Sequence, residues 1–166
     1  MQNEVMNIYR TALLADQQQH LPLLAQWYFD EWGELTQAAS VHTVEARLQE
    51  YLNADRIPLI VIAENAGELM GAVQLKYREM TIYPDREHWL GGVYVAEKFR
   101  NRKVAETLIR KVLALARRMG VQELYLQTIR PDGGLYRRLG WQAVNSVNYR
   151  GLDVLVMVKQ LGPDCD

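Results

Sequence analysis

Cysteine and histidine are scarce in this sequence of 166 residues, which has one cysteine, Cys165, and three scattered histidines, His20, His42 and His88. A single cysteine cannot form a disulfide within the chain, and this usage is typical of a reducing compartment. A structural metal site needs several such ligands at close spacing. We therefore predict that the protein holds no metal.

Long apolar runs and linkers are also missing. No apolar run reaches the roughly 20 residues needed to span a bilayer. The first residues, Met1-Gln2-Asn3-Glu4, lack the basic start and apolar segment of a signal peptide. The five prolines are dispersed, and there is no internal repeat or Pro/Gly-rich segment. These absences predict a cytoplasmic protein without a membrane partner, folded as a single domain over residues 1–166.

An excess of either charge is absent, since 19 Lys and Arg against 20 Asp and Glu give a net charge of −1. This balance argues against a dedicated nucleic-acid binder, which usually has a basic excess. Four Trp, nine Tyr and two Phe are too much apolar bulk for a disordered chain. The charge is unevenly spread, because Lys98 to Lys111 holds six basic residues and one acidic residue, Glu106. We call this segment the basic island.

Hydrophobic periodicity and turn residues predict a layered α/β domain with seven strands and four helices. Pro22 stands near the start of the first helix, and Thr43 is the predicted N-cap of the second, which carries Val44, Leu48, Tyr51 and Leu52. A continuous apolar run at 59–63 is typical of a strand covered on both faces. The predicted strands are 8–12, 59–63, 69–77, 89–95, 124–128, 141–148 and 152–159, and the helices are 16–32, 43–52, 103–119 and 134–139.

The basic island begins where a predicted strand gives way to the helix at 103–119. The first N–H groups of a helix lack intrahelical acceptors and lie at the positive end of its dipole, so they can bind a phosphate. Arg100, Arg102 and Lys103 add positive charge at this point. The alternative is a solvated basic turn.

With these residues, the sequence resembles the GNAT superfamily of acyl-CoA-dependent N-acetyltransferases. The pyrophosphate loop of that family reads Arg/Gln-x-x-Gly-x-Gly/Ala after a strand, and this chain has Arg100-x-x-Lys103-x-Ala105. Lys103 takes the place of the first glycine, which is unfavourable if that position needs a positive φ. The family's Tyr before Gly-Phe corresponds to Tyr136 before Gly140-Trp141. Many members have an Asn before this Tyr helix, where this chain has 131–134, Pro-Asp-Gly-Gly.

The resemblance implies a GNAT-like α/β (α+β) fold with a mixed, mostly antiparallel, splayed sheet of six to seven strands and about four helices. Acetyl-CoA would enter between the strands at 89–95 and 124–128, with the backbone of Val93 and Val95 on its pantetheine arm. The implied pyrophosphate-binding residues are Arg100, Arg102, Lys103, Val104 and Ala105. Tyr136 would protonate the leaving thiolate, or would serve only to anchor its helix on the core.

A primary amine is mostly protonated at neutral pH, so direct attack on a thioester needs a base. Glu87, just ahead of the strand at 89–95, is the predicted base, and His88 is the alternative. Glu79 and Asp85 are less favoured. Both Glu87 and His88 can also be simple exposed residues at the start of a strand.

The predicted acceptor pocket lies between the first two helices and the loop at 77–88. Its aromatic and acidic side chains would suit a cationic amine. The alternative is that the aromatics are core residues and the acids a solvated rim. These side chains are Trp27, Tyr28, Trp32, Tyr77, Tyr83, Asp30, Glu31, Glu34, Glu79, Asp85 and Glu87.

The sequence thus predicts an acetyl-CoA-dependent N-acetyltransferase that transfers an acetyl group to a small-molecule or peptide primary amine by direct attack in a ternary complex. A non-catalytic acyl-CoA sensor on the same fold is the alternative, because of Lys103 and the missing Asn. Binding of nucleic-acid phosphates by the basic island is less favoured, since stacking aromatics are not interleaved with it. Homodimers are common in the resembled family, although no segment of the sequence marks an interface.

Overall fold

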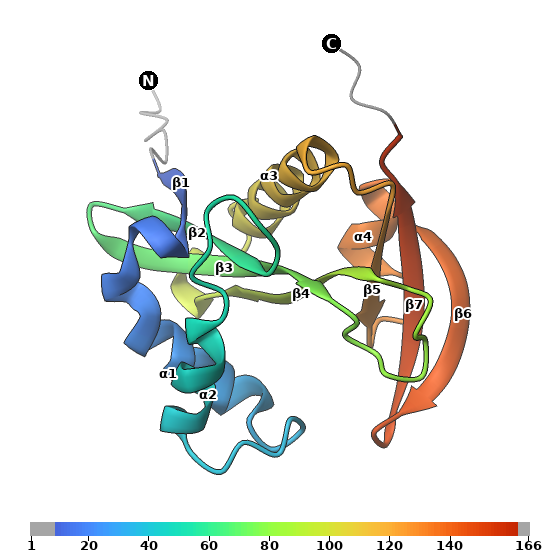
Figure 1. Ribbon diagram of the computed structural model, residues 1–166, viewed down its shortest axis with the longest axis horizontal. Coiled ribbons are helices and arrows are strands. Elements are labelled where there is room, and N and C mark those ends of the chain that lie inside the picture. The colour runs from blue at the N-terminus through green and yellow to red at the C-terminus, as the bar shows by residue number, and fades with distance from the viewer. Residues whose placement is uncertain (1–8, 163–166) are drawn as a thin grey trace.

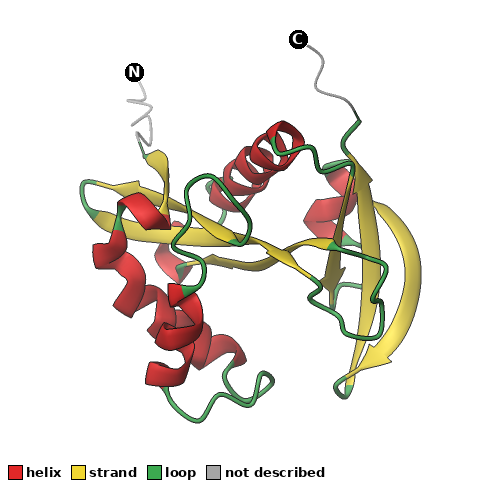
Figure 2. Cartoon of the chain, in the orientation of Figure 1, coloured by secondary structure: helices red, strands yellow, loops and turns green. Residues whose placement is uncertain are grey.

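The computed structural model describes residues 9–162, which form one seven-stranded sheet with helices on both faces (Figures 1 and 2). The strand order is β1-β2-β3-β4-β5-β7-β6, and every neighbouring pair is antiparallel except β4 and β5, which are parallel. The strands are β1 Arg10–Leu13, β2 Leu59–Asn65, β3 Glu68–Tyr77, β4 His88–Val95, β5 Glu123–Thr128, β6 Gln142–Tyr149 and β7 Leu152–Gln160. The helices are α1 Leu21–Trp32, α2 Val41–Gln49, α3 Val104–Arg118 and α4 Gly134–Arg138.

The predicted fold class, element types and element order are confirmed, but the first helix is shorter than predicted. Residues 14–16 and 18–20 form two 3-10 turns, and α1 begins only at Leu21. Gln17 separates the two turns because its backbone is not helical, with φ −138° and ψ 53°. Pro22 lies in the first turn of α1, where the missing N–H has no helical acceptor to lose. The predicted strand at 8–12 is β1, although Ile8 lies outside the described residues.

The predicted N-cap of the second helix is wrong. Ser40, not Thr43, has the extended backbone of an N-cap, and its side chain accepts a hydrogen bond from the Thr43 N–H at 3.4 Å. The helix also ends at Gln49, so Tyr51 and Leu52 lie beyond it. Both still pack against the apolar cluster of α1 and α2, which explains why the periodicity extended to them.

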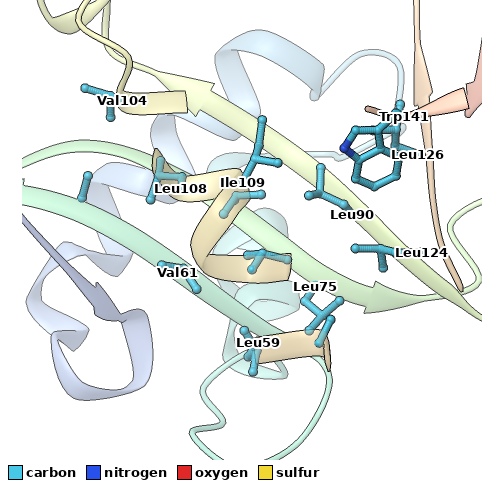
Figure 3. Packing of buried hydrophobic residues seen from close by; sticks show 14 of the residues in the cluster. Leu59, Val61, Leu75, Leu90, Val104, Leu108, Ile109, Leu124, Leu126 and Trp141 are labelled. Atoms are coloured by element: carbon cyan, nitrogen blue, oxygen red, sulfur yellow. The ribbon is translucent and has the colours of Figure 1, made fainter. Parts of the chain in front are cut away.

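Two apolar clusters on opposite faces of the sheet hold the helices in place. Alternate residues of the strands face α3 and include Val61, Leu75 and Leu90, which pack around Leu108 (Figure 3). The intervening residues, among them Ile60, face α1 and α2. Because both faces are covered, β2 is buried from Leu59 to Glu64, as its apolar run predicts.

A bulge distorts β4 opposite β3. The register between the two strands shifts between Ala72 and Gln74, and Gly92 has a φ of +55°. A Cβ on Gly92 would lie 2.6 Å from Cδ of Gln74, so only glycine leaves room for this buried amide. The hydroxyl of Tyr28 donates a hydrogen bond of 2.7 Å to the Gly92 carbonyl. This hydrogen bond therefore links helix α1 to the bulge in β4.

The parallel junction between β4 and β5 is short. Trp89 and Tyr125 are the register pair that joins the two strands, and their ring centroids are 5.6 Å apart. Beyond this pair the strands diverge, and the sheet is divided into a β1–β4 part and a β5–β7 part (Figure 1). The splay predicted between the strands at 89–95 and 124–128 is thus present.

Substitution of Gly92 tests the bulge. Gly92→Ala should lower the free energy of unfolding by about 2–4 kcal/mol, because a left-handed φ and an overpacked Cβ are both unfavourable. Gly67→Ala is the matched control, since Gly67 has a φ of +80° but no atom within 4 Å of the place where a Cβ would lie. It should lose only about 1 kcal/mol. Urea unfolding followed by Trp fluorescence measures both, and equal losses would contradict the steric account.

Candidate active site

The loop before α3 contains two residues with a left-handed backbone. Lys103 is the N-cap of α3 and adopts the left-handed conformation, with φ 60° and ψ 22°, and no side chain caps the helix. Asn101 is also left-handed, with φ 66°. The position of the motif's first glycine does take a positive φ, so Lys103 holds a conformation in which glycine is favoured.

The start of α3 presents backbone N–H groups surrounded by positive charge. The side chain of Val104 is buried in the core, whereas Arg102 and Lys103 are exposed. N–H groups of the first turn have no intrahelical acceptors. An anion at this helix end would therefore contact backbone N–H groups, with the basic side chains around it.

The remaining charges of the basic island are arranged differently. The Nε of Arg100 donates a hydrogen bond of 2.9 Å to the Val95 carbonyl and so ties the loop to the end of β4. Arg110 pairs with Glu106 at 2.8 Å, and this hydrogen bond lowers the pKa of the carboxyl. Arg110 also contributes to a groove of about 260 Å³ on α3, away from its N-terminus. That groove is lined by Arg110, Leu113, Ala114, Arg117, Leu139 and Lys159.

The structure places Val93 and Val95 on the half of β4 that lies beyond its pairing with β5. Both side chains are half-buried and pack against the cluster around α3. The Val95 carbonyl accepts the hydrogen bond from Arg100, so one backbone acceptor predicted for the pantetheine arm is already engaged.

Tyr136 lies on α4, the short helix after β5. Gly133 caps this helix, and the Asp132 carboxylate accepts a 2.9 Å hydrogen bond from the Gly134 N–H. The Tyr136 ring packs edge-on to Trp141, with centroids 6.2 Å apart. Burial and the charge of Glu79 raise the pKa of Tyr136 to about 12. The residue is thus both an anchor of α4 and a hydroxyl that stays protonated at neutral pH.

The predicted base candidates lie on the loop between β3 and β4 and at the first residue of β4. Glu87 is 51% exposed, and its carboxylate lies 3.9 Å from a guanidinium nitrogen of Arg78. His88 opens β4 half-buried, with its ring 5.4 Å from that of Tyr77. Asp85 is exposed. Glu87 and Asp85 thus form a solvated rim on the loop between β3 and β4, and His88 lies at its end.

The predicted aromatic wall is mainly core. Tyr28 is buried, and Trp27 and Trp32 pack against Tyr94 with ring centroids 5.2 and 6.3 Å apart. These residues belong to the cluster between α1, α2 and the sheet. Tyr83, on the loop, packs against the buried cluster of Met80 and Trp89, and Arg86 stacks at 3.9 Å from its ring centre. Tyr77, at the end of β3, is the exposed exception. The alternative interpretation of the α1 aromatics as core residues is the one that the structure supports.

The structure brings together a polar group that was not predicted as a unit. Gln74 and Lys76 project from β3 toward the α1 and α2 face, and Lys76 pairs with Glu79 at 2.8 Å. Tyr51, beyond α2, lies within electrostatic reach of both charges. The signal in the sequence is the two-residue spacing of polar Gln74 and Lys76 inside an apolar strand.

Metal ligands do not gather anywhere within residues 9–162. No cluster of three or more His, Cys, Asp or Glu side chains that could hold a metal ion occurs there. No helix in the same range is long and apolar enough to cross a membrane.

The loop before α3, the splay between β4 and β5, and Tyr136 on α4 are the features expected from the resemblance. A family model described as the acetyltransferase (GNAT) family matches residues 21–141. The chain belongs to this family and is an N-acetyltransferase by class. No curated protein sequence matches it.

Solved structures support the fold. An aminoglycoside 6′-acetyltransferase type Ii is 18% identical and aligns with a TM-score of 0.72 over 94% of this chain and 99% of its own. The structure of yncA from Salmonella typhimurium with its cofactor acetyl-CoA is 14% identical, with a TM-score of 0.70 over 94% and 95%. A ribosomal-protein-alanine N-acetyltransferase from Brucella melitensis is 23% identical, with a TM-score of 0.69 over 92% and 99%.

Two substitutions of Lys103 that both remove its charge isolate the effect of its backbone conformation. Lys103→Gly should have a free energy of unfolding about 1 kcal/mol higher than Lys103→Ala, because glycine adopts the left-handed φ without the steric cost of a Cβ. Thermal and urea unfolding of the two variants measure this difference. Equal stability, or a less stable glycine variant, would show that the left-handed conformation is not strained.

Proposed function

We propose that the protein is an acetyl-CoA-dependent N-acetyltransferase that acetylates a primary amine by direct attack in a ternary complex. The observation that carries this proposal is the loop before α3, where exposed cations surround free helix N–H groups beside the splay of β4 and β5. A pyrophosphate carries the negative charge that this helix end favours. Solved structures of the same fold with acetyl-CoA or coenzyme A bound support the choice of co-substrate.

The residues of the loop divide the binding of acetyl-CoA between backbone and side chains. Val104 and Ala105 would contribute N–H groups, because the side chain of Val104 points into the core. Arg102 and Lys103 would add charge from the solvent side. Arg100 would act through the loop, since its guanidinium holds the end of β4.

The strand β4 would hold the reacting part of the co-substrate. Beyond Trp89 its edge toward β5 is released, and an extended pantetheine arm can follow such an edge through the backbone of Val93 and Val95. The thioester supplies an acyl carbon that is open to attack by an amine. An N–H group of β4 would polarise its carbonyl, as an oxyanion hole does.

Tyr136 would donate a proton to the departing sulfur. A hydroxyl whose pKa is about 12 is protonated at neutral pH, so it is available as a donor there. A thiolate with a pKa near ~8.5 is a weaker base than a tyrosinate, so the first effect of Tyr136 is a strong hydrogen bond to the developing negative charge.

The acceptor is an amine that enters from the face of the sheet covered by α1 and α2. It reaches the point beyond Trp89 where β4 and β5 separate, which we call the vertex of the splay. An aminoglycoside acetyltransferase and a ribosomal-protein-alanine acetyltransferase share this fold, so both a small molecule and a peptide amino group are acceptors to test. The predicted base Glu87 lies on the rim and would have to act through water.

The decisive measurement is binding and turnover with acetyl-CoA. Millimolar acetyl-CoA should raise the melting temperature, because a ligand at about 100 times its Kd adds about 2.7 kcal/mol to the free energy of unfolding. Free thiol and an acetylated product mass should appear with one member of a panel of polyamines, amino sugars, aminoglycosides, amino acids and peptides. No stabilisation by any acyl-CoA would contradict the proposal, and binding without turnover would favour the sensor alternative.

Tyr136→Phe tests the proton donor. It should reduce kcat by about 100-fold and leave the KM for acetyl-CoA nearly unchanged, because general acid catalysis contributes at least that factor. The kcat of the wild-type protein should not fall from ionisation of Tyr136 below pH ~10, since its pKa lies above the ordinary tyrosine value. An unchanged kcat in the variant would leave Tyr136 only its packing role.

A further inference from the structure

One acidic side chain of the loop between β3 and β4 is withdrawn from solvent. Glu79 retains 16% exposure, whereas Glu87 on the same loop retains 51%. The Oε1 atom of Glu79 lies 2.8 Å from Nζ of Lys76. The β3 strand thus fixes this carboxylate through an ion pair, and no comparable partner fixes Glu87, which is 3.9 Å from Arg78.

The second oxygen of the same carboxylate is unsatisfied. Oε2 of Glu79 is shielded from bulk solvent and has no hydrogen-bond partner among the described residues. Buried carboxylate oxygens normally accept a hydrogen bond, because losing water without a replacement is strongly unfavourable. Oε2 can therefore accept a hydrogen bond from a donor that does not belong to the described residues.

The position of this oxygen follows from the strand below it. A Cβ on Gly91 would lie 2.8 Å from Oε1 of Glu79 and 2.8 Å from Cε of Lys76, so the ion pair lies directly on β4 at a residue without a side chain. Gly91 comes two residues after Trp89, where β4 leaves β5. The carboxylate is thus located at the vertex of the splay.

The charged and titratable groups around the Glu79–Lys76 pair come from four separate parts of the chain. Lys76 lies on β3, Tyr51 follows α2, Tyr136 lies on α4, and Arg150, in the β6–β7 turn, acts on Lys76. The Glu79 charge contributes to the raised pKa of Tyr136, so the carboxylate is within electrostatic reach of that hydroxyl. The proposed proton donor and this unsatisfied acceptor therefore influence each other electrostatically.

We propose that Glu79, held by Lys76 on Gly91, binds the acceptor amine through Oε2 and takes the proton that the amine loses. This inference rests on the proposed acetyltransferase function. The acceptor arrives as an ammonium ion, whose N–H satisfies Oε2. Transfer of one proton to the carboxylate frees the lone pair, which forms the C–N bond as the C–S bond breaks.

The protons balance over the whole reaction. The sulfur receives a proton from Tyr136, and the second proton of the nitrogen restores Tyr136 through water. Glu79 passes its own proton to solvent, so the reaction yields the amide, the free thiol and one proton. Lys76 touches neither reactant and acts as a positioning residue that orients the carboxylate.

Glu79→Gln is the direct test, because it keeps the size of the side chain and removes its basicity. With the most active amine of the panel, kcat should fall at least ~100-fold, while the KM for acetyl-CoA changes by less than ~3-fold. The residual rate should increase with pH up to the pKa of the amine, since only the free base can then attack. An ε-amino acceptor, with a pKa near ~10.4, should be impaired more than an α-amino acceptor, with a pKa near ~8.

Three other variants make the result specific. Glu68→Gln is the matched control. Glu68 begins β3, at the end of that strand away from Lys76, and forms an exposed ion pair with Lys98. Its loss should keep kcat within ~2-fold. Gly91→Ala should displace the Glu79 carboxylate by steric contact, and Lys76→Met should release it by removing its ion-pair partner. Both variants should have a lower kcat, while acetyl-CoA should still raise their melting temperature. The shape of the pH profile in Glu79→Gln distinguishes a proton acceptor from a merely structural residue.

The outcomes separate this inference from the function beneath it. If the wild-type protein turns over and Glu79→Gln does so within ~3-fold and with the same pH profile, the inference is overturned while the function stands. If Glu87→Gln alone shows the loss and the altered profile, the rim carboxylate is the base and Glu79 is structural. If the wild-type protein neither binds nor turns over acetyl-CoA, the proposed function fails and takes the inference with it.

Discussion

The short parallel contact between β4 and β5 is the constraint on which the site depends. The two strands are paired only at Trp89 and Tyr125, so the two parts of the seven-stranded sheet diverge from this point. The divergence leaves the edge of β4 without a neighbouring strand, and it occurs just before the bulge at Gly92. Everything proposed for the site lies beside this junction: the loop before α3 at one end, Tyr136 across it and Glu79 at its vertex.

The helices make this junction stable by burying the sheet on both faces. Helix α3 covers the face on which Leu75 and Leu90 lie, and its own start is fixed by the buried side chain of Val104. Because Val104 points inward, the N–H groups of that first turn are held in position rather than frayed. Helix α1 reaches the opposite face and bonds the Gly92 carbonyl through Tyr28. The apolar core therefore sets the geometry of the polar groups.

Much of the fold and part of the site could be predicted from local sequence. The apolar run of β2, the amphipathic α3 and the turn residues around Gly67 and Gly140 each specify their own element through periodicity or a backbone preference. The loop before α3 and Tyr136 could be located in the sequence because they follow elements in a fixed order. The N-cap of α2 was misplaced by three residues, since both Ser40 and Thr43 have capping side chains and only the extended backbone at Ser40 decides between them.

By itself the sequence determined the order of the elements, the buried faces and the family to which the chain belongs, because these depend on short-range periodicity and on motifs within a few residues. Only the tertiary structure decided which acidic side chain is desolvated. Glu79 and Glu87 stand on one loop with the same chemistry, and what separates them is a lysine on β3 and a glycine on β4 that meet Glu79 in space. Desolvation and pairing are properties of packing between distant segments, so no local pattern encodes them.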